Sequence, residues 1–135
     1  MVIAYYLPEA YSQQVQLLYE NTPEPTINSF IEVEVLSVFS RLVRTQELTL
    51  DKAREAAALF SAHLEQGLYT QIPLRVAHYR QAREYIARFY LPLKAPDALH
   101  LAAAALEQLP LLTADRQLAH NAESLGIAVE LLTVS

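Results

Sequence analysis

Residues 91–119 read LPLKAPDALHLAAAALEQLPLLTADRQLA, and this pattern predicts a helix, a short strand and a second helix. The first helix is expected from about Ala98 to Gln108. Pro96 and Asp97 favour this start, because a proline and a first-turn carboxylate both suit a helix N-terminus. Helices that alternate with strands in this way are typical of an α/β layer with a parallel sheet.

The same stretch predicts two acidic side chains at one edge of that sheet. Leu111 to Thr113 form the apolar strand, and Ala114-Asp115-Arg116 opens the second helix. Residues just past the carboxyl ends of parallel strands line the ligand crevice. Asp115 is therefore expected at such an end, and Asp97 at a helix start that opens onto the same edge.

The rest of the chain predicts a helix-rich fold with three or four short strands. Turn and cap residues give the expected bounds. In the first part of the chain we expect a strand tail or helix start at 2–6, a helix from Pro8 to about Glu20, a strand at 26–28, and a helix from Phe30 to about Thr45 that Ser29 caps. Next come a helix that Thr49 caps and that runs to about Gln66 before Gly67, an extended segment at 68–72, a helix from Pro73 to about Phe89, and a strand at 127–132 after Gly126.

Composition limits the functions open to the chain. A length of 135 residues with 53% hydrophobic side chains indicates one domain, residues 1–135, with its own core. The absence of cysteine excludes a disulfide scaffold and thiolate zinc sites. With two glycines in all, a glycine-rich phosphate loop is excluded. The net charge of −5 gives no overall attraction for nucleic acid, so any RNA contact needs a local basic patch.

The sequence shows neither a membrane-spanning segment nor a signal peptide. We find no apolar run of the roughly 18–20 residues that a membrane helix needs. The N-terminus lacks the basic region and the cleavage site of a signal peptide. These observations favour a cytoplasmic protein.

The motifs PDALHLAAA and LLTADRQLA, residues 96–104 and 111–119, resemble the third and fourth motifs of PIN domains. Within that family the chain is most similar to the VapC-type toxins of toxin–antitoxin pairs. The resemblance implies a three-layer α/β/α sandwich with a short, mainly parallel sheet. By match, Asp97 is the acid of the third motif, Asp115 is the acid of the fourth, and Thr113 is the fourth motif's hydroxyl residue.

The third acidic ligand comes from the segment SFIEVEVLS, residues 29–37, which resembles the family's second motif. The motif alignment selects Glu34. The helical periodicity alone places Glu32 in the apolar arc and Glu34 at its edge, so Glu32 remains the alternative. The carboxylates also have simpler interpretations: Asp97 as a first-turn charge, Asp115 as a cap and Glu34 as a solvated helix residue.

The resemblance implies a metal-dependent endoribonuclease, the toxin of a type II toxin–antitoxin pair. Glu34, Asp97 and Asp115 would bind Mg2+ or Mn2+, which activates water against an RNA phosphodiester. The implied partners are an antitoxin protein, a second copy of the chain in a homodimer, and RNA, of which structured RNAs such as tRNA are the suggested type.

The family's first motif has no counterpart here. PIN toxins begin with a strand that ends in Asp-Thr-Ser, whereas this chain opens MVIAYYLPEAYS with no acidic residue before Glu9. The resemblance therefore implies that the first ligand and first strand are missing. A truncation, a misassigned start codon and a decayed gene all fit this pattern. The alternative function is a non-catalytic PIN-like protein that only binds antitoxin or RNA.

Other polar residues have two interpretations each. Arg116 either steers phosphate or is a solvated arginine. His100, three residues after Asp97, is either a ligand or a packing histidine. The remaining histidines, His63, His78 and His120, are interpreted as structural or exposed. Four arginines around one helix form either an RNA-facing patch or ordinary exposed charges: Arg75, Arg80, Arg83 and Arg88. The eight tyrosines either stack on bases or pack in the core.

Overall fold

The computed structural model describes residues 25–131, and its contacts divide the chain into two units, Met1–Ile72 and Pro73–Ser135. The segments expected at residues 2–6 and 8–20, and the last residue of the expected final strand, lie outside the described range. The expected single domain of residues 1–135 remains a prediction.

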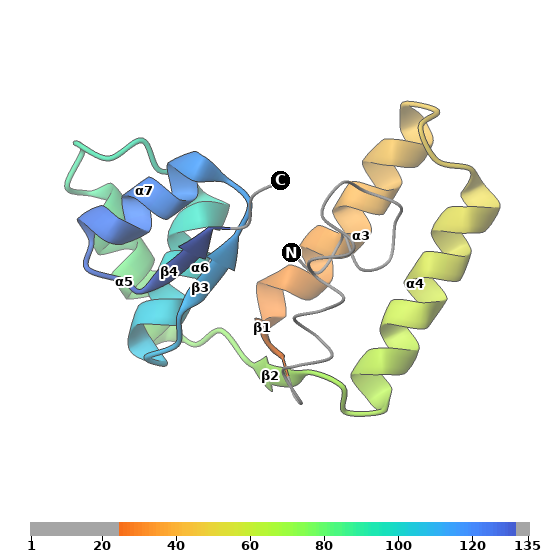
Figure 1. Cartoon of the computed structure of the whole chain (residues 1–135), viewed down its shortest axis with the longest axis horizontal. Coiled ribbons are helices and arrows are strands. Elements are labelled where there is room, and N and C mark those ends of the chain that lie inside the picture. The colour runs from red at the N-terminus through yellow and green to blue at the C-terminus, as the bar shows by residue number, and fades with distance from the viewer. Residues whose placement is uncertain (1–24, 132–135) are drawn as a thin grey trace. The chain divides into compact units, whose positions relative to one another are not determined.

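The first unit consists of a helical hairpin beside a parallel strand pair (Figure 1). Strand β1 (Thr26–Asn28) pairs with β2 (Thr70–Ile72), with Thr26 opposite Thr70. Between them run α3 (Ser29–Arg44) and α4 (Leu50–Glu65). The two helices and the strand pair share one apolar core, whose buried members are Ile27, Val35, Phe39, Ala53, Ala56, Phe60 and Tyr69.

Side-chain caps set the start of both helices in this unit. Thr49 caps α4, as predicted: its Oγ1 accepts a hydrogen bond of 3.2 Å from the Lys52 N–H. The predicted Ser29 cap of α3 is wrong by one residue. Asn28 is the cap, because its Oδ1 accepts from the Phe30 and Ile31 N–H groups at 2.9 and 3.2 Å.

The second unit holds three helices and another parallel strand pair. Its elements are α5 (Val76–Ile86), α6 (Ala95–Leu106), β3 (Leu111–Thr113), α7 (Arg116–Ser124) and β4 (Val129–Leu131). Strands β3 and β4 are parallel, with Leu111 opposite Val129. Helix α6 packs against α5 and β3, and it buries six side chains, mostly alanines: Ala98, Leu99, Leu101, Ala102, Ala103 and Ala104. Small side chains let neighbouring backbones approach closely.

The predicted helix-rich α/β fold with short parallel strands is confirmed. The strands at 26–28 and 111–113 have the predicted bounds. The helix expected from Pro73 to about Phe89 is shorter, Val76–Ile86. At its start, His78 Nδ1 accepts the Arg75 N–H, and beyond its end Phe89 has a positive φ of 62°, which cannot continue a right-handed helix. Among residues 25–131, each helix is too short or too polar to cross a bilayer.

Candidate functional site

The turn after β3 holds Asp115 in a defined orientation. Thr113 is buried, and its Oγ1 accepts a 3.0 Å hydrogen bond from the Asp115 N–H. Asp115 caps α7: its Oδ1 accepts from the Gln117 and Leu118 N–H groups at 2.9 and 3.1 Å. Both of these hydrogen bonds fall on Oδ1, which leaves Oδ2 of this exposed side chain to face a ligand. The cap and ligand interpretations of Asp115 are therefore compatible.

Asp97 lies in the first turn of α6, directly after Pro96. It is half-buried, and the next two side chains, Ala98 and Leu99, are fully buried in the unit. A negative charge is favoured at this position, because the unpaired N–H groups of the first turn give the helix start a partial positive charge.

The path of the chain brings the start of α6 and the end of β3 to the same end of the second unit. Helix α6 turns back through residues 107–110 into β3, so helix and strand run in opposite directions (Figure 1). The first turn of α6, which contains Asp97, and the residue just past β3, Asp115, therefore both belong to this end of the second unit. This is the topology that the sequence predicts; the metal-binding roles of both side chains remain predictions.

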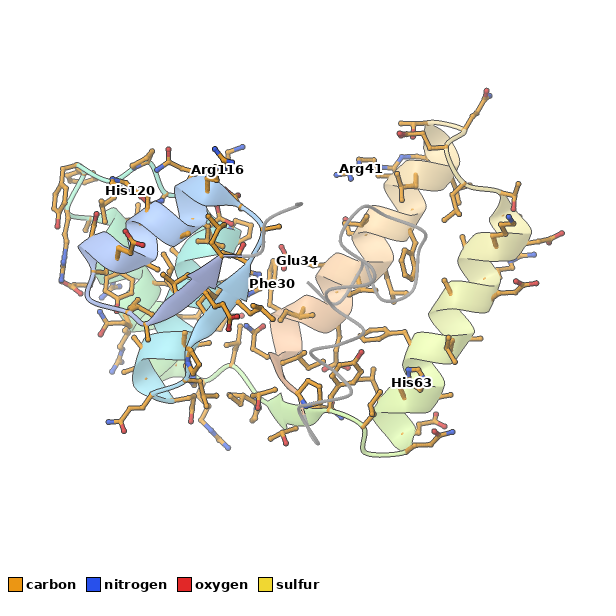
Figure 2. All side chains as sticks on the ribbon, viewed as in Figure 1. Phe30, Glu34, Arg41, His63, Arg116 and His120 are labelled. Carbon is orange, nitrogen blue, oxygen red and sulfur yellow. The ribbon has the colours of Figure 1, made fainter. Side chains whose placement is uncertain are left out.

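Glu34 belongs to α3 of the first unit. It is half-buried, as is Glu32, whereas Val33 between them is 64% exposed. Burial therefore does not decide whether Glu32 or Glu34 is the better candidate for the third acidic ligand. Figure 2 shows Glu34 on the same side of α3 as Phe30, one turn earlier.

The carboxylate oxygens of aspartate and glutamate suit a hard divalent cation such as Mg2+ or Mn2+. Within residues 25–131, neither unit taken by itself gathers three His, Asp or Glu side chains into a metal-binding group. A set made of Glu34, Asp97 and Asp115 draws on both units.

Basic charge is concentrated in the segment before Asp97. Residues 75–94 hold five basic side chains, Arg75, Arg80, Arg83, Arg88 and Lys94, against Glu84. Residues 1–72, in contrast, hold four basic and nine acidic side chains and account for the net charge of −5. Arg116, the first residue of α7, adds one exposed cation directly after Asp115 (Figure 2).

Two buried polar residues of the second unit have partners that the sequence does not reveal. Asn121 on α7 is 1% exposed; its Nδ2 donates to the Pro92 carbonyl at 3.3 Å, and its Oδ1 accepts from Gln117 Nε2 at 3.3 Å. Asn121 thus ties α7 to the loop that leads into α6 and Asp97. His78 is buried between α5 and α6. The other histidines are half-buried (His63, His100) or exposed (His120).

Comparison with protein-family models gives a family for this chain. The family model described as PIN domain matches residues 1–124. The search of curated proteins finds no match.

Proposed function

Because the chain belongs to the PIN domain family, we propose that it is a metal-dependent endoribonuclease and the VapC-type toxin of a type II toxin–antitoxin pair. PIN domains are generally nucleases and typically use divalent metal ions. The family match runs across both units, so we propose that they form one PIN-like domain with a three-layer α/β/α sandwich.

The observation that supports this function best is the course of the chain in the second unit: α6 and β3 run in opposite directions, so the start of α6 and the end of β3 lie at the same end of the unit. Asp97 stands in the first turn of α6 and Asp115 directly after β3. The Asp115 N–H donates to the Thr113 hydroxyl, and Asp115 Oδ1 accepts from two N–H groups of α7, which fixes the orientation of this carboxylate. Carboxylate oxygens at the carboxyl end of a parallel strand and at a neighbouring helix start are suited to bind a divalent cation.

Glu34 would complete the ligand set from α3, with Glu32 as the alternative. The bound Mg2+ or Mn2+ would supply Lewis-acid activation of the phosphate and of a water molecule. Thr113 would position Asp115 through its backbone, and Arg116 would bind a non-bridging phosphate oxygen beside the site.

The proposed partners are RNA, for example tRNA, an antitoxin protein and a second copy of the chain, all in the cytoplasm. The helical hairpin supports a protein–protein contact, because it exposes large apolar side chains on both helices: Val33, Leu36, Leu50 and Leu59. Exposed apolar side chains of this size are compatible with an interaction surface.

RNA cleavage with and without Mn2+ or Mg2+ tests the proposal. We expect the wild-type chain to cut labelled tRNA and single-stranded RNA, and Asp97→Asn and Asp115→Asn to lose most of the metal-dependent rate, a factor of at least about 100. Comparing Glu34→Gln with Glu32→Gln identifies the third ligand: the former should be inactive and the latter active. Cleavage that survives both aspartate substitutions would overturn the assignment.

Calorimetric titration with Mn2+ separates the proposal from a protein that only binds antitoxin or RNA. We expect heat of binding that disappears in the double variant Asp97→Asn/Asp115→Asn. Neither heat nor cleavage in the wild-type chain would favour the non-catalytic alternative.

A further inference from the structure

The connection between α5 and α6 exposes two adjacent aromatic rings. Phe89 is 87% exposed and Tyr90 is 65% exposed. The backbone of Phe89 has φ of 62°, in the left-handed region that a bulky side chain adopts only at a cost in free energy. Glycine is the residue that suits such a position. A large exposed ring on a strained backbone thus contributes nothing evident to folding, and such outliers cluster at functional sites.

The side chains beside Phe89 are ordered by one arginine. Arg88 Nε and Nη2 donate to Glu84 Oε1 at 3.1 and 2.9 Å, and the guanidinium lies 5.5 Å from the ring centroid of Tyr85. Interactions with Tyr90 and with Glu84 raise the pKa of Arg88. The Phe89 ring extends into solvent.

The cations nearest in sequence to the aromatic pair are Arg83 in the last turn of α5, Arg88 and Lys94, and they favour nucleic acid as its ligand. Residues 75–94 hold five basic side chains and one acidic one in a chain with a net charge of −5. Cations interleaved with exposed aromatic rings are the pattern that binds single-stranded nucleic acid, because the cations meet phosphates and the rings stack on bases.

The position of the connection links it to the candidate catalytic edge. It leads directly into the first turn of α6, which contains Asp97, and so lies at the same end of the second unit (Figure 1). Asn121 bonds the Pro92 carbonyl and joins the connection to α7, the helix that Asp115 caps. A strand of RNA bound on this connection would therefore pass beside the two carboxylates.

We propose that Phe89 and Tyr90 form a base-stacking platform for a single-stranded stretch of the RNA substrate. Arg83, Arg88 and Lys94 neutralise the phosphates next to the stacked bases. The inference rests on the proposed ribonuclease function and deepens it, since it assigns the surface that orients the substrate.

Fluorescence anisotropy with the full chain tests this platform. The probe is a labelled single-stranded RNA of about 12 nucleotides, in EDTA so that no cleavage occurs. We expect Phe89→Gly/Tyr90→Ala to bind at least about tenfold more weakly than wild type, and Phe89→Tyr to bind as wild type does. The melting temperature of Phe89→Gly/Tyr90→Ala should not fall below that of wild type, because glycine relieves the left-handed backbone and the Tyr90 side chain is exposed. Weaker binding then cannot come from unfolding.

An oligonucleotide with abasic sites supplies the control for stacking. It should bind wild type and the double variant with equal affinity. Suppose that the wild-type chain cleaves RNA and that the double variant binds ordinary RNA as tightly as wild type. The stacking proposal would then be wrong while the ribonuclease function stands, and the aromatic pair would serve a protein partner instead. A wild-type chain that neither binds nor cleaves RNA overturns the proposed function and the platform together.

Discussion

His78 Nε2 lies 3.0 Å from Glu107 Oε1 and joins the first turn of α5 to the end of α6. The His78 side chain is buried, and its Nδ1 accepts the Arg75 N–H at 2.9 Å. Because Nδ1 is the acceptor, Nε2 carries the hydrogen and donates a hydrogen bond to Glu107 Oε1. One neutral imidazole thus accepts a backbone N–H at the start of α5 and bonds a side chain at the end of α6. This pairing helps to orient α6, and with it Asp97.

The first prediction concerns this histidine. His78→Ala should lower the free energy of unfolding by about 2–4 kcal/mol, since it leaves the Arg75 N–H without its acceptor and opens a cavity. Glu107→Gln should cost less than about 1 kcal/mol, because the amide oxygen still accepts from Nε2 at a half-exposed site. Urea denaturation of both variants measures the difference. Equal losses would show that the buried contact with Arg75 contributes little.

The second prediction separates the two roles of Asp115. Asp115→Ala removes the cap of α7 and should lower stability by about 1 kcal/mol. Asp115→Asn keeps an oxygen for the Gln117 and Leu118 N–H groups and should leave stability nearly unchanged. Both variants should lose metal-dependent cleavage. Thermal denaturation and the cleavage assay together check this, and full activity in Asp115→Asn would limit Asp115 to capping.

The third prediction concerns Asn121. Asn121→Ala should cost about 1–3 kcal/mol, because it removes two hydrogen bonds, to the Pro92 carbonyl and from Gln117, and leaves a cavity where the buried Asn121 side chain was. The loss should be greatest locally, as faster amide hydrogen exchange in residues 87–94, measured by mass spectrometry. Gln117→Ala is the matched control, since it leaves the bond to Pro92 intact. Unchanged exchange in that loop would mean that other contacts hold it.

Local signals in the sequence predict much of this fold. The strands at 26–28 and 111–113, the Thr49 cap of α4 and the first-turn position of Asp97 all follow from short-range patterns that the structure confirms. The Asn28 cap is missed by one residue, because Asn and Ser are both good caps and stand side by side. The order of helix α6, strand β3 and helix α7 also predicts that Asp97 and Asp115 share an edge.

Long-range partners are what the sequence does not reveal. His78 bonds Glu107 and Asn121 bonds Pro92, in each case across 29 residues. No local pattern distinguishes these side chains from exposed polar ones on the same helices. The choice between Glu32 and Glu34 likewise depends on the surroundings of α3, since both are half-buried there. Phe89 is missed because a positive φ is expected at glycine or asparagine rather than at an aromatic residue.

The last prediction concerns the end of α6. Gln108 has φ of 56°, and the hydrogen bonds from Gln108 N–H to the Ala105 carbonyl and from Leu109 N–H to the Ala104 carbonyl close the helix. Glycine favours this left-handed cap, so Gln108→Gly should raise the free energy of unfolding by about 0.5–1 kcal/mol. The same change inside α5, Gln81→Gly, should lower it by about 1 kcal/mol. If the turn at residues 107–110 has this geometry, urea denaturation should give changes in the free energy of unfolding of opposite sign for Gln108→Gly and Gln81→Gly. Destabilisation by both substitutions would contradict the left-handed cap, and with it the tight return from α6 into β3 that brings Asp97 and Asp115 to one edge.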